Sequence, residues 1–467
     1  QAGKYISFGD IVTKMYNLSQ GMAPLGRGIS QFIIAPLLGD GNLSLSSAVK
    51  PSPPPYMTPV TYLLPSVEWV WTPSSFLAIL VFLFFWASRP PSRAPKQPRT
   101  HDPTSTRYRA LRRKAFPPPF PNGWYHVCNL SDVQRGAVKS ISALGMDVVC
   151  FKGAKSGEVA ILDAHCPHLG AHLGEGGQVV GDSLRCPFHS WRFDTDGKVV
   201  EIPYAKLSTI PSKCKTRKHH SRVVLDAVWM WFDAEGRPPL WELKEFEDVE
   251  SDGLTLRCVK QNFFNQHLAE MCENSADPYH FQTLHGPLPI PGLNKLIGCR
   301  HEITQKYPQR ENAQDEMHMC KFTERMADLE LMGGKFSFRK LVPFAALILD
   351  SIFTSVVFEG PGNISFTIRT PLGTMRMFMT NLPVEPFRQY VENHWYAPWY
   401  FPTFLVKIFA TLSAHALEQD RQVWENKMYR KNMNLVGGDG PFPAFRRYWA
   451  NHYSESSDKL GRETLEW

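Results

Sequence analysis

Two short motifs in the middle of the chain constrain it most, because each pairs one cysteine with one histidine. Cys166 is followed by His168, and Cys186 is followed by His189. A [2Fe–2S] cluster with two Cys on one iron and two His on the other requires this donor set, and such clusters have reduction potentials of roughly −150 to +300 mV. The sequence therefore predicts a centre that accepts and passes on single electrons.

A structural zinc site is the alternative, since two Cys and two His also suit tetrahedral zinc. Zinc fingers group their ligands as Cys-Cys and then His-His, whereas each motif here carries one of each. Five glycines lie between the two motifs and let backbone N–H groups approach inorganic sulfur: Gly170, Gly174, Gly176, Gly177 and Gly181. We therefore predict a Rieske-type cluster. The neighbouring His165 and His172 do not fit the ligand spacing, and we interpret them as surface or packing histidines.

Composition narrows the function classes. The 467 residues suffice for two or three domains. The net charge of +7 is mild, and no basic run is interleaved with a nucleic-acid recognition motif, so nucleic acid is not an expected partner. The nine cysteines show no framework spacing, which indicates free thiols in a reducing compartment.

The N-terminal part predicts a membrane anchor. Residues 1–65 have no assignable fold, but residues 66–88 are mostly apolar and flanked by Trp69, Trp71 and Trp86. About twenty apolar residues span a bilayer core. A buried helix is the alternative. The basic, proline-rich residues 89–121 predict an extended linker and, by the positive-inside rule, cytosolic catalytic domains. We expect a single-pass protein of the endoplasmic reticulum.

Two further domains and a tail follow. Residues 122–240 contain short β-runs separated by glycines, which predict a small antiparallel β domain with the cluster loops at its tip. Residues 241–435 change pattern: a helical stretch over 274–285, strands at 355–358 and 364–368, and a final helix from about 404 to 432. Residues 436–467 are a C-terminal tail. The fold class is α+β.

A second metal site is indicated in the later domain. His280 and His285 stand five residues apart, and Gly286 and Pro287 follow at once, so the helix is expected to end near His285 and turn its ring inward. Two His and a distant carboxylate form the facial triad of non-haem Fe(II) oxygenases, which leaves open positions for dioxygen.

The two sites together carry a family resemblance. The chain resembles the Rieske non-haem iron oxygenases, in which Asn-x-x-Asp-x-x-His-x-x-x-x-His marks the mononuclear iron; Asn274, Asp277, His280 and His285 match it. The resemblance implies a helix-grip (START-like) catalytic domain and a third ligand on the last long helix, where Asp420 matches best. Glu418 and Glu425 compete, but Glu418 would lie about 200° from Asp420 on a helix.

The resemblance also implies an assembly. The family's head-to-tail homotrimers place the cluster of one subunit near the mononuclear iron of the next, so Asp277 would bridge His189 and His280 across that junction. Helix capping is the alternative for Asp277. Asn274 would orient a ligand or line the pocket. The extra Cys of respiratory-chain Rieske proteins is absent from both motifs, so the cluster is of the oxygenase type.

The residues around both motifs carry a closer resemblance, and this resemblance implies a sterol substrate. From roughly residue 65 to residue 435 the chain is similar to the animal cholesterol 7-desaturases of the Neverland type. This similarity implies removal of hydrogen at C7 and C8 of cholesterol, with O2 as co-substrate. No Gly-x-Gly-x-x-Gly opens a helix, so NAD(P)H would act through a separate reductase or ferredoxin. The apolar residues 344–349 and 395–402 would line a pocket or enter the headgroup region.

Three alternatives stay open. A steroid or lipid hydroxylase of the same family would use the same iron and electrons, and the sequence does not separate it from a desaturase. A membrane-anchored Rieske electron carrier would need only the cluster ligands. A degenerate scaffold would keep the motifs without activity.

Overall fold

The computed structural model describes residues 106–459, apart from residues 207, 244–248, 250–251, 287–296, 307–318, 332–334 and 343. The predicted leader (1–65), the predicted membrane span (66–88) and residues 89–105 of the predicted linker lie outside the described residues. Within the part of the chain that is described, no helix is both long and apolar enough to cross a membrane.

The first half of the described chain is built from short antiparallel strands, as predicted. Three small sheets have the orders β1-β11-β10, β2-β3-β4-β9 and β5-β6-β7-β8. Their strands are β1 (Gly123–Asn129), β2 (Val138–Ala143), β3 (Met146–Lys152), β4 (Val159–Asp163), β5 (Gln178–Val180), β6 (Ser183–Arg185), β7 (Arg192–Phe193), β8 (Val199–Glu201), β9 (Lys218–His219), β10 (Ser221–Val224) and β11 (Ala227–Phe232), with a 3-10 turn at Leu130–Gly136.

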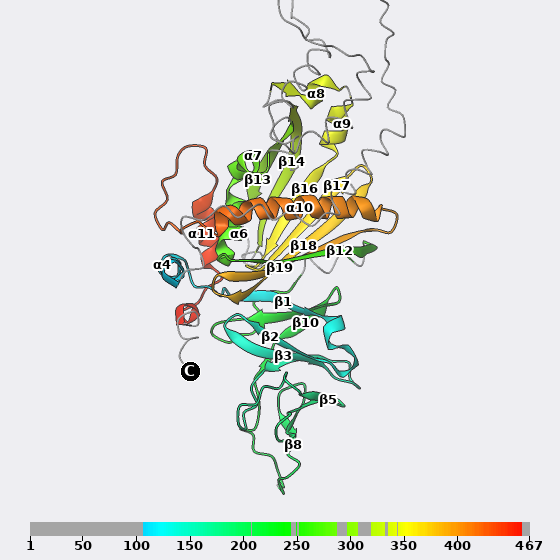
Figure 1. The fold of residues 1–467 in the computed structure, drawn as a ribbon, viewed down its shortest axis with the longest axis vertical. Coiled ribbons are helices and arrows are strands. Elements are labelled where there is room, and N and C mark those ends of the chain that lie inside the picture. The colour runs from blue at the N-terminus through cyan, green and yellow to red at the C-terminus, as the bar shows by residue number, and fades with distance from the viewer. Residues whose placement is uncertain are drawn as a thin grey trace, which may run out of the picture. The chain divides into compact units, whose positions relative to one another are not determined.

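The second half is one large antiparallel sheet with helices around it. The strand order is β12-β19-β18-β17-β16-β14-β13, with β15 paired to β14. The strands are β12 (Leu254–Phe264), β13 (Ile297–Lys306), β14 (Met319–Leu331), β15 (Phe336–Ser337), β16 (Phe353–Glu359), β17 (Asn363–Thr370), β18 (Gly373–Glu385) and β19 (Arg388–Pro398). Figure 1 shows the long helix α10 (Thr403–Trp424) lying across this sheet.

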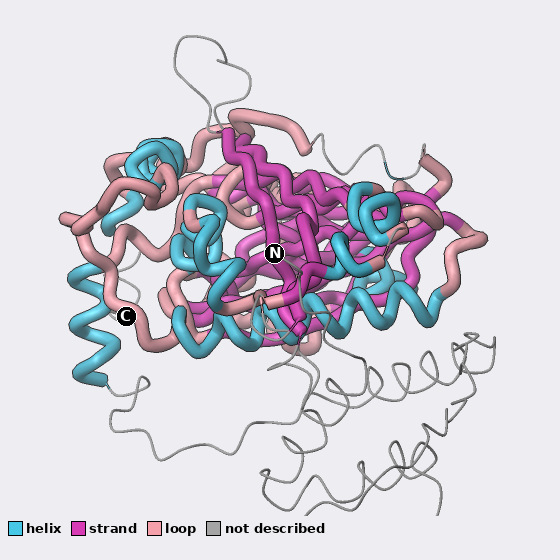
Figure 2. The backbone as a smooth tube through the Cα atoms, turned by 90° about the horizontal axis from the view of Figure 1, so that it is seen from above, coloured by secondary structure: helices cyan, strands magenta, loops and turns pink. Residues whose placement is uncertain are grey.

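Shorter helices complete the second half: α6 (Leu268–Glu273), the 3-10 turn η3 (Asn274–Ala276), α7 (Pro278–Thr283), α8 (Phe338–Leu341) and α9 (Ala345–Asp350). Figure 2, with strands in magenta and helices in cyan, shows the strands as a central layer with the helices around them. Helix α10 buries Val406, Ala410, Asp420 and Trp424. It ends at Trp424, so the predicted final helix is shorter than expected at its C-terminal end.

Residues 106–121 do not form the extended spacer predicted for the linker. Thr106–Ala115 form helix α4, and Arg112 within it is buried against Glu270 at 2.6 Å. The Phe116 ring stacks on His267, with ring centroids 5.1 Å apart. The basic composition suggested a solvated segment, but the Arg112 guanidinium finds a buried carboxylate partner in the catalytic half of the chain, and its segment becomes part of the core.

The predicted tail also contains a packed helix. Helix α11 (Phe442–Ala450) buries Phe445, Tyr448 and Trp449. Its first turn carries prolines, whose fixed φ suits the start of a helix. The N–H group that proline lacks would have no partner within the helix at this position. The tail is therefore part of the fold at least as far as this helix.

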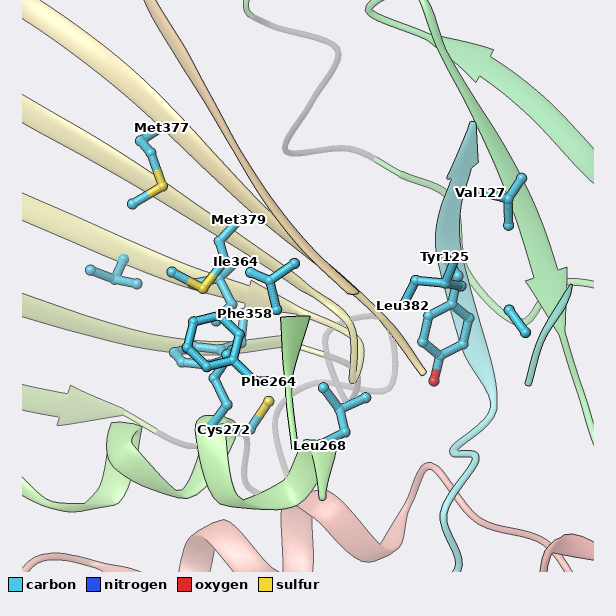
Figure 3. Close-up of a cluster of buried hydrophobic side chains, with 14 of the residues drawn as sticks. Tyr125, Val127, Phe264, Leu268, Cys272, Phe358, Ile364, Met377, Met379 and Leu382 are labelled. Carbon is cyan, nitrogen blue, oxygen red and sulfur yellow. The ribbon is translucent and has the colours of Figure 1, made fainter. Parts of the chain in front are cut away.

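One hydrophobic cluster joins the two halves of the described chain. Figure 3 shows Tyr125 and Val127 of β1 beside Leu382 of β18, with Met377 and Met379 farther along the same strand. The side-chain amide of Asn363 also donates to the backbone carbonyl of Trp124 at 2.8 Å. Strand β1 therefore packs against the large sheet, and the cluster-bearing half shares a core with the catalytic half.

Candidate cluster and mononuclear metal sites

The two predicted cluster loops are held by tight backbone hydrogen bonds. In the first loop, between β4 and β5, the Cys166 N–H donates to Ala171 and the Gly170 N–H donates back to Cys166, each at 2.9 Å. Gly170 adopts a φ of +76°, which favours glycine. In the second loop, between β6 and β7, the Cys186 N–H donates to the Trp191 carbonyl at 2.8 Å. Each loop thus fixes a cysteine in a closed turn.

The four predicted cluster ligands come together with the two residue types in different environments. Cys166 and Cys186 are 3% and 2% exposed, whereas His168 and His189 are half-buried. The two imidazole rings lie 4.7 Å apart. A Rieske cluster has one iron on the thiolates and the other on the imidazoles, so a buried thiol pair beside a more accessible histidine pair fits it.

The raised pKa of the Cys166 thiol also fits a [2Fe–2S] cluster at this place. Burial and the adjacent Cys186 raise the pKa of Cys166 to about 11, although a hydrogen bond from the His168 backbone N–H acts in the opposite direction. Two neighbouring buried thiols cannot both ionise without a compensating positive charge. A bound iron pair supplies that charge, because coordinating thiols are deprotonated.

Two aromatic residues support the histidine side of the cluster loops. The Trp191 ring stacks on His168 with centroids 4.6 Å apart and an interplanar angle of 9°. Its indole N–H donates to the Tyr204 hydroxyl at 2.9 Å. Trp191 follows the second motif by two residues in the sequence. Tyr204 was missed, because a lone tyrosine beyond β8 carries no spacing signal. His165 and His172 stay outside this group and contact each other, with rings 5.2 Å apart.

The predicted second site also assembles. One ligand atom from each of His280, His285 and Asp420 lies within 4.8 Å of the others. The Nε2 atom of His285 is 3.2 Å from Oδ1 of Asp420. Helix α10 brings Asp420 to the two histidines from far along the chain, and its inward face explains why Asp420 is buried. These three side chains form the donor set of a two-histidine, one-carboxylate iron site.

The competing carboxylates point elsewhere, as the helical angle predicted. Glu418 accepts a hydrogen bond from Arg421 at 3.0 Å and is 43% exposed. Glu425 accepts from the backbone N–H of Asn265 and from Arg421, both at 3.0 Å. Neither belongs to the three-residue group.

The chain breaks its helix before the first histidine. The helical stretch expected over 274–285 consists of η3 and α7, interrupted at Asp277, and α6 precedes it. The Asp277 carboxylate caps α7 by accepting from the N–H groups of Tyr279 and His280 at 3.1 and 3.2 Å. Its backbone carbonyl accepts from Nδ1 of His280. Capping, the alternative weighed for Asp277, is therefore present, and its carboxylate is still 37% exposed.

Hydrogen bonds set the tautomer of both histidines. Because the Asp277 carbonyl can only accept, Nδ1 of His280 carries the proton and Nε2 keeps its lone pair. In His285, Nδ1 lies 3.1 Å from Oε1 of Gln419, which has the same effect. Metal-binding histidines are usually oriented by such a partner on the other nitrogen. Gln419 and the Asp277 carbonyl were not predicted, since neither position has a motif of its own.

The protonation tendencies of the two rings differ. Burial lowers the pKa of His280, which favours the neutral imidazole that a metal requires. Burial acts in the same direction on His285, but the Asp420 carboxylate outweighs it and raises the pKa of His285. A cation bound between His285 and Asp420 would replace the proton that this pair otherwise favours.

Asn274 contacts Asp420, the predicted third ligand, directly. Its side-chain N–H donates to Oδ1 of Asp420 at 3.2 Å, and its Oδ1 accepts from the Trp424 indole at 3.2 Å. Of the two roles expected for Asn274, orienting a ligand is the one that this geometry matches.

A cavity of about 500 Å³ lies beside these residues, with Asp277 in its wall. Its lining includes Glu273, Lys427, Arg430 and Arg446. Sites for apolar ligands are lined mostly by hydrophobic side chains. The same cavity is also lined by Met428, Met433, Leu435 and Phe442, so its wall combines apolar and charged side chains.

Comparisons with known proteins identify a domain in each half of the described chain. The family description "Rieske [2Fe-2S] domain" matches residues 123–211, and "3-Ketosteroid 9alpha-hydroxylase C-terminal domain" matches residues 230–329. The predicted Rieske domain is thereby confirmed. Among solved structures, dicamba monooxygenase bound to dicamba superposes with a TM-score of 0.54 at 16% identity, covering 73% of this chain and 98% of that one. This likeness concerns the fold alone.

Curated relatives are more similar in sequence. The chain is 32% identical over 345 residues to cholesterol 7-desaturase nvd 1 of Ciona intestinalis, covering 74% of this chain and 71% of the relative. It is 31% identical over 351 residues to cholesterol 7-desaturase nvd of Drosophila melanogaster, covering 73% and 77%. With this identity over most of both chains, and with a Rieske domain in the matched region, the chain belongs to the cholesterol 7-desaturase family.

Proposed function

We propose that the protein is a Rieske oxygenase that desaturates cholesterol at C7–C8 to give 7-dehydrocholesterol. The observation that carries the proposal is the convergence of His280, His285 and Asp420 in a chain that also has a Rieske domain. An Fe(II) ion bound by these three would supply dioxygen activation. The relatives named cholesterol 7-desaturase supply the substrate and the reaction.

The chain's own residues then have distinct tasks. His280 and His285 offer the Nε2 lone pairs, since their Nδ1 atoms are engaged by Asp277 and Gln419. Asn274 orients the Asp420 carboxylate. Cys166, His168, Cys186 and His189 would hold the [2Fe–2S] group, which would supply single-electron transfer with NAD(P)H as the indirect donor through a separate reductase or ferredoxin.

We further propose that the working unit is a homotrimer in which Asp277 bridges His189 and His280 of adjacent subunits. The partly exposed Asp277 carboxylate, which lies in the wall of the cavity, supports this arrangement because it is accessible to another chain. Leu169 and Phe188, each beside a cluster histidine, are 65% and 62% exposed and could contact the neighbouring subunit or an electron donor. Exposed apolar side chains at such a rim are typical of interaction sites.

Membrane attachment is part of the same proposal. The apolar residues 66–88 would anchor the protein in the endoplasmic reticulum with its catalytic domains in the cytosol. Two further segments support contact with lipid: Phe344 and Leu347 are 72% and 75% exposed, and Trp399 and Tyr400 are 80% and 56% exposed. Trp395 and Tyr396, expected with them, instead lie in the core of β19. Sugar on Asn17 or Asn42, but not on Asn129, is the expected glycosylation pattern.

A hydroxylase is the second candidate, favoured by the match of residues 230–329 to a ketosteroid hydroxylase domain. Cells unable to make 7-dehydrocholesterol, fed labelled cholesterol, separate the two by mass spectrometry. Loss of two hydrogens with the ultraviolet absorption of a 5,7-diene supports the desaturase, and gain of one oxygen supports the hydroxylase. No product, together with iron in the cluster alone, would support the electron carrier.

A further inference from the structure

A second group of three metal-ligating side chains lies away from the mononuclear site. His126 of β1 and Glu392 and His394 of β19 each offer one ligand atom within 4.8 Å of the other two. All three are buried, with exposures of 6%, 3% and 7%. Apart from this group and the one at His280, the described residues contain no such set of three or more.

The strands bring these residues together for simple geometric reasons. Glu392 and His394 are alternate residues of β19, so both side chains point to the same face of the large sheet. His126 lies on β1 at a register irregularity in its pairing with β11, next to Cys128. The group therefore joins a strand of the cluster-bearing half to a strand of the catalytic half.

Each of the two histidines places a ring nitrogen beside the same oxygen of Glu392. Nδ1 of His126 lies 3.0 Å from Oε2 of Glu392, and Nε2 of His394 lies 3.1 Å from the same oxygen. Ligands on a tetrahedral zinc, with bonds of ~2.0–2.1 Å, are separated by about 3.3 Å. The observed spacings are within a few tenths of an ångström of that value.

The tautomer of His126 makes this convergence unusual. Its Nε2 lies 3.0 Å from the Cys128 carbonyl oxygen, which can only accept, so Nε2 carries the proton. In a neutral ring, Nδ1 then presents a lone pair to a buried carboxylate oxygen, and the two repel. A positive charge is needed between them: a metal ion, or a second proton on the ring.

The other carboxylate oxygen of Glu392 already accepts two hydrogen bonds. Oε1 of Glu392 accepts from the Tyr390 hydroxyl at 2.7 Å and from the Gln261 side chain at 2.6 Å. This leaves Oε2 facing the histidines, and such outer contacts are what orient metal-binding carboxylates. The Thr380 hydroxyl, 3.4 Å from Nδ1 of His126, adds an oxygen at the same place.

We propose that His126, Glu392 and His394 bind a divalent transition metal, with zinc as the best match, which fastens β1 to the large sheet. Two imidazoles and one carboxylate are a zinc donor set that leaves a fourth position open, and the Thr380 hydroxyl lies nearest to it. The buried position and the location between the two halves of the chain fit a structural role. This site is independent of the dioxygen chemistry proposed for His280, His285 and Asp420.

The test is the zinc content of the full chain with its cluster loaded, in a His280→Ala/His285→Ala background so that zinc cannot occupy the mononuclear site. We expect close to one zinc per chain, with nitrogen and oxygen neighbours at ~2.0–2.1 Å by X-ray absorption at the zinc edge. Adding His394→Gln or Glu392→Gln should remove it. His219→Gln is the control and should retain the zinc; it breaks the 2.7 Å pair between the buried His219 and the half-exposed Asp163 elsewhere.

The cluster's absorption and circular dichroism report whether each variant is folded. If a ligand variant fails to fold, Gln261→Ala in the same background should weaken zinc binding ~10–100-fold in competition with a chromophoric chelator. The proposal is overturned if folded protein takes up no zinc from micromolar zinc buffers, which would assign the positive charge to a proton. Zinc with sulfur neighbours, or zinc unaffected by both ligand variants, would overturn it as well.

Discussion

The side-chain N–H of Asn274 and Nε2 of His285 meet the same oxygen of Asp420, each at 3.2 Å. The Asn274 carbonyl oxygen is fixed in turn by the Trp424 indole. Three residues from distant parts of the chain therefore set the direction of one carboxylate, and this arrangement determines how well the group can hold a metal.

Replacing Asn274 with Ala should weaken Fe(II) binding at the mononuclear site ~10–100-fold, as loss of an orienting contact usually does. Activity should recover when Fe(II) is raised, with KM for the sterol unchanged. Iron titration and steady-state kinetics measure this effect. A variant that holds full iron and still has a raised KM would mean that Asn274 lines the substrate pocket.

Replacing Asp420 with Ala should remove the mononuclear iron and product formation while the cluster remains reducible. The reason is that only the two histidines would remain as donors, and the negative charge of the carboxylate would be lost. Iron analysis and the sterol-product assay check both expectations. Glu418→Ala is the matched control on the same helix and should keep both properties, because Glu418 is paired with Arg421 instead. Normal iron and product in the Asp420 variant would exclude Asp420 as a ligand.

The sequence was sufficient to predict that Asp420 would lie with His280 and His285, and which residues the cluster loops would carry, because their spacing is local or their helix is regular. The distant residues that hydrogen-bond to them and orient them could not be predicted in this way. Asn274 meets Asp420 across 146 positions of sequence, and Arg112 meets Glu270 across 158. A periodic pattern reports which face of a strand or helix is buried, but it says nothing about which distant residue lies opposite. For the same reason the sequence did not indicate that His126, Glu392 and His394 lie together, since these residues share no motif.

Residues 106–121 of the linker show a second limit of sequence-based prediction. Its arginines and prolines are typical of a solvated spacer, and this interpretation was wrong for residues 106–121 because one arginine is neutralised inside the core. Composition describes the average residue of a segment, whereas a single buried ion pair can determine where the segment lies. The interrupted helix at Asp277 is similar: one capping carboxylate, which no periodicity reports, divides it.

Stability should depend on pH through His301, whose Nδ1 lies 2.6 Å from Glu324. Burial alone would lower the pKa of His301, but hydrogen bonds and charge from Cys299 and Glu324 outweigh it and raise the pKa to about 9. A raised folded-state pKa stabilises the protein fully below about pH 6.5 and loses this contribution as the pH rises through about 9. The loss is up to about 3 kcal/mol.

Denaturation measured from pH 6 to pH 10 tests this effect. His301→Gln should be less stable than the unmodified protein near pH 6 and should lose less stability across the window. His172→Gln, a half-buried histidine whose ring contacts His165, is the control and should keep the original slope. Parallel pH profiles for the unmodified protein and the His301 variant would contradict the assignment.

Replacing Arg112 with Ala should destabilise the protein by about 3–5 kcal/mol, because it leaves the buried Glu270 carboxylate without its guanidinium partner. Arg112 also donates to the Trp424 carbonyl at 2.9 Å, at the end of the helix that carries Asp420. Its loss should therefore loosen that helix end and lower iron retention as well. Denaturation midpoints and iron content after gel filtration measure the two effects.

Two variants separate charge from packing. Arg113→Ala changes the exposed neighbouring arginine of the same helix and should alter stability by less than about 0.5 kcal/mol. Arg112→Met with Glu270→Leu removes both buried charges at similar volume, and we expect it to recover most of the lost stability, since apolar replacements of buried pairs are often tolerated. If Arg112→Ala and Arg113→Ala were equally mild, helix α4 would be an attached spacer after all, and the buried ion pair would not anchor it.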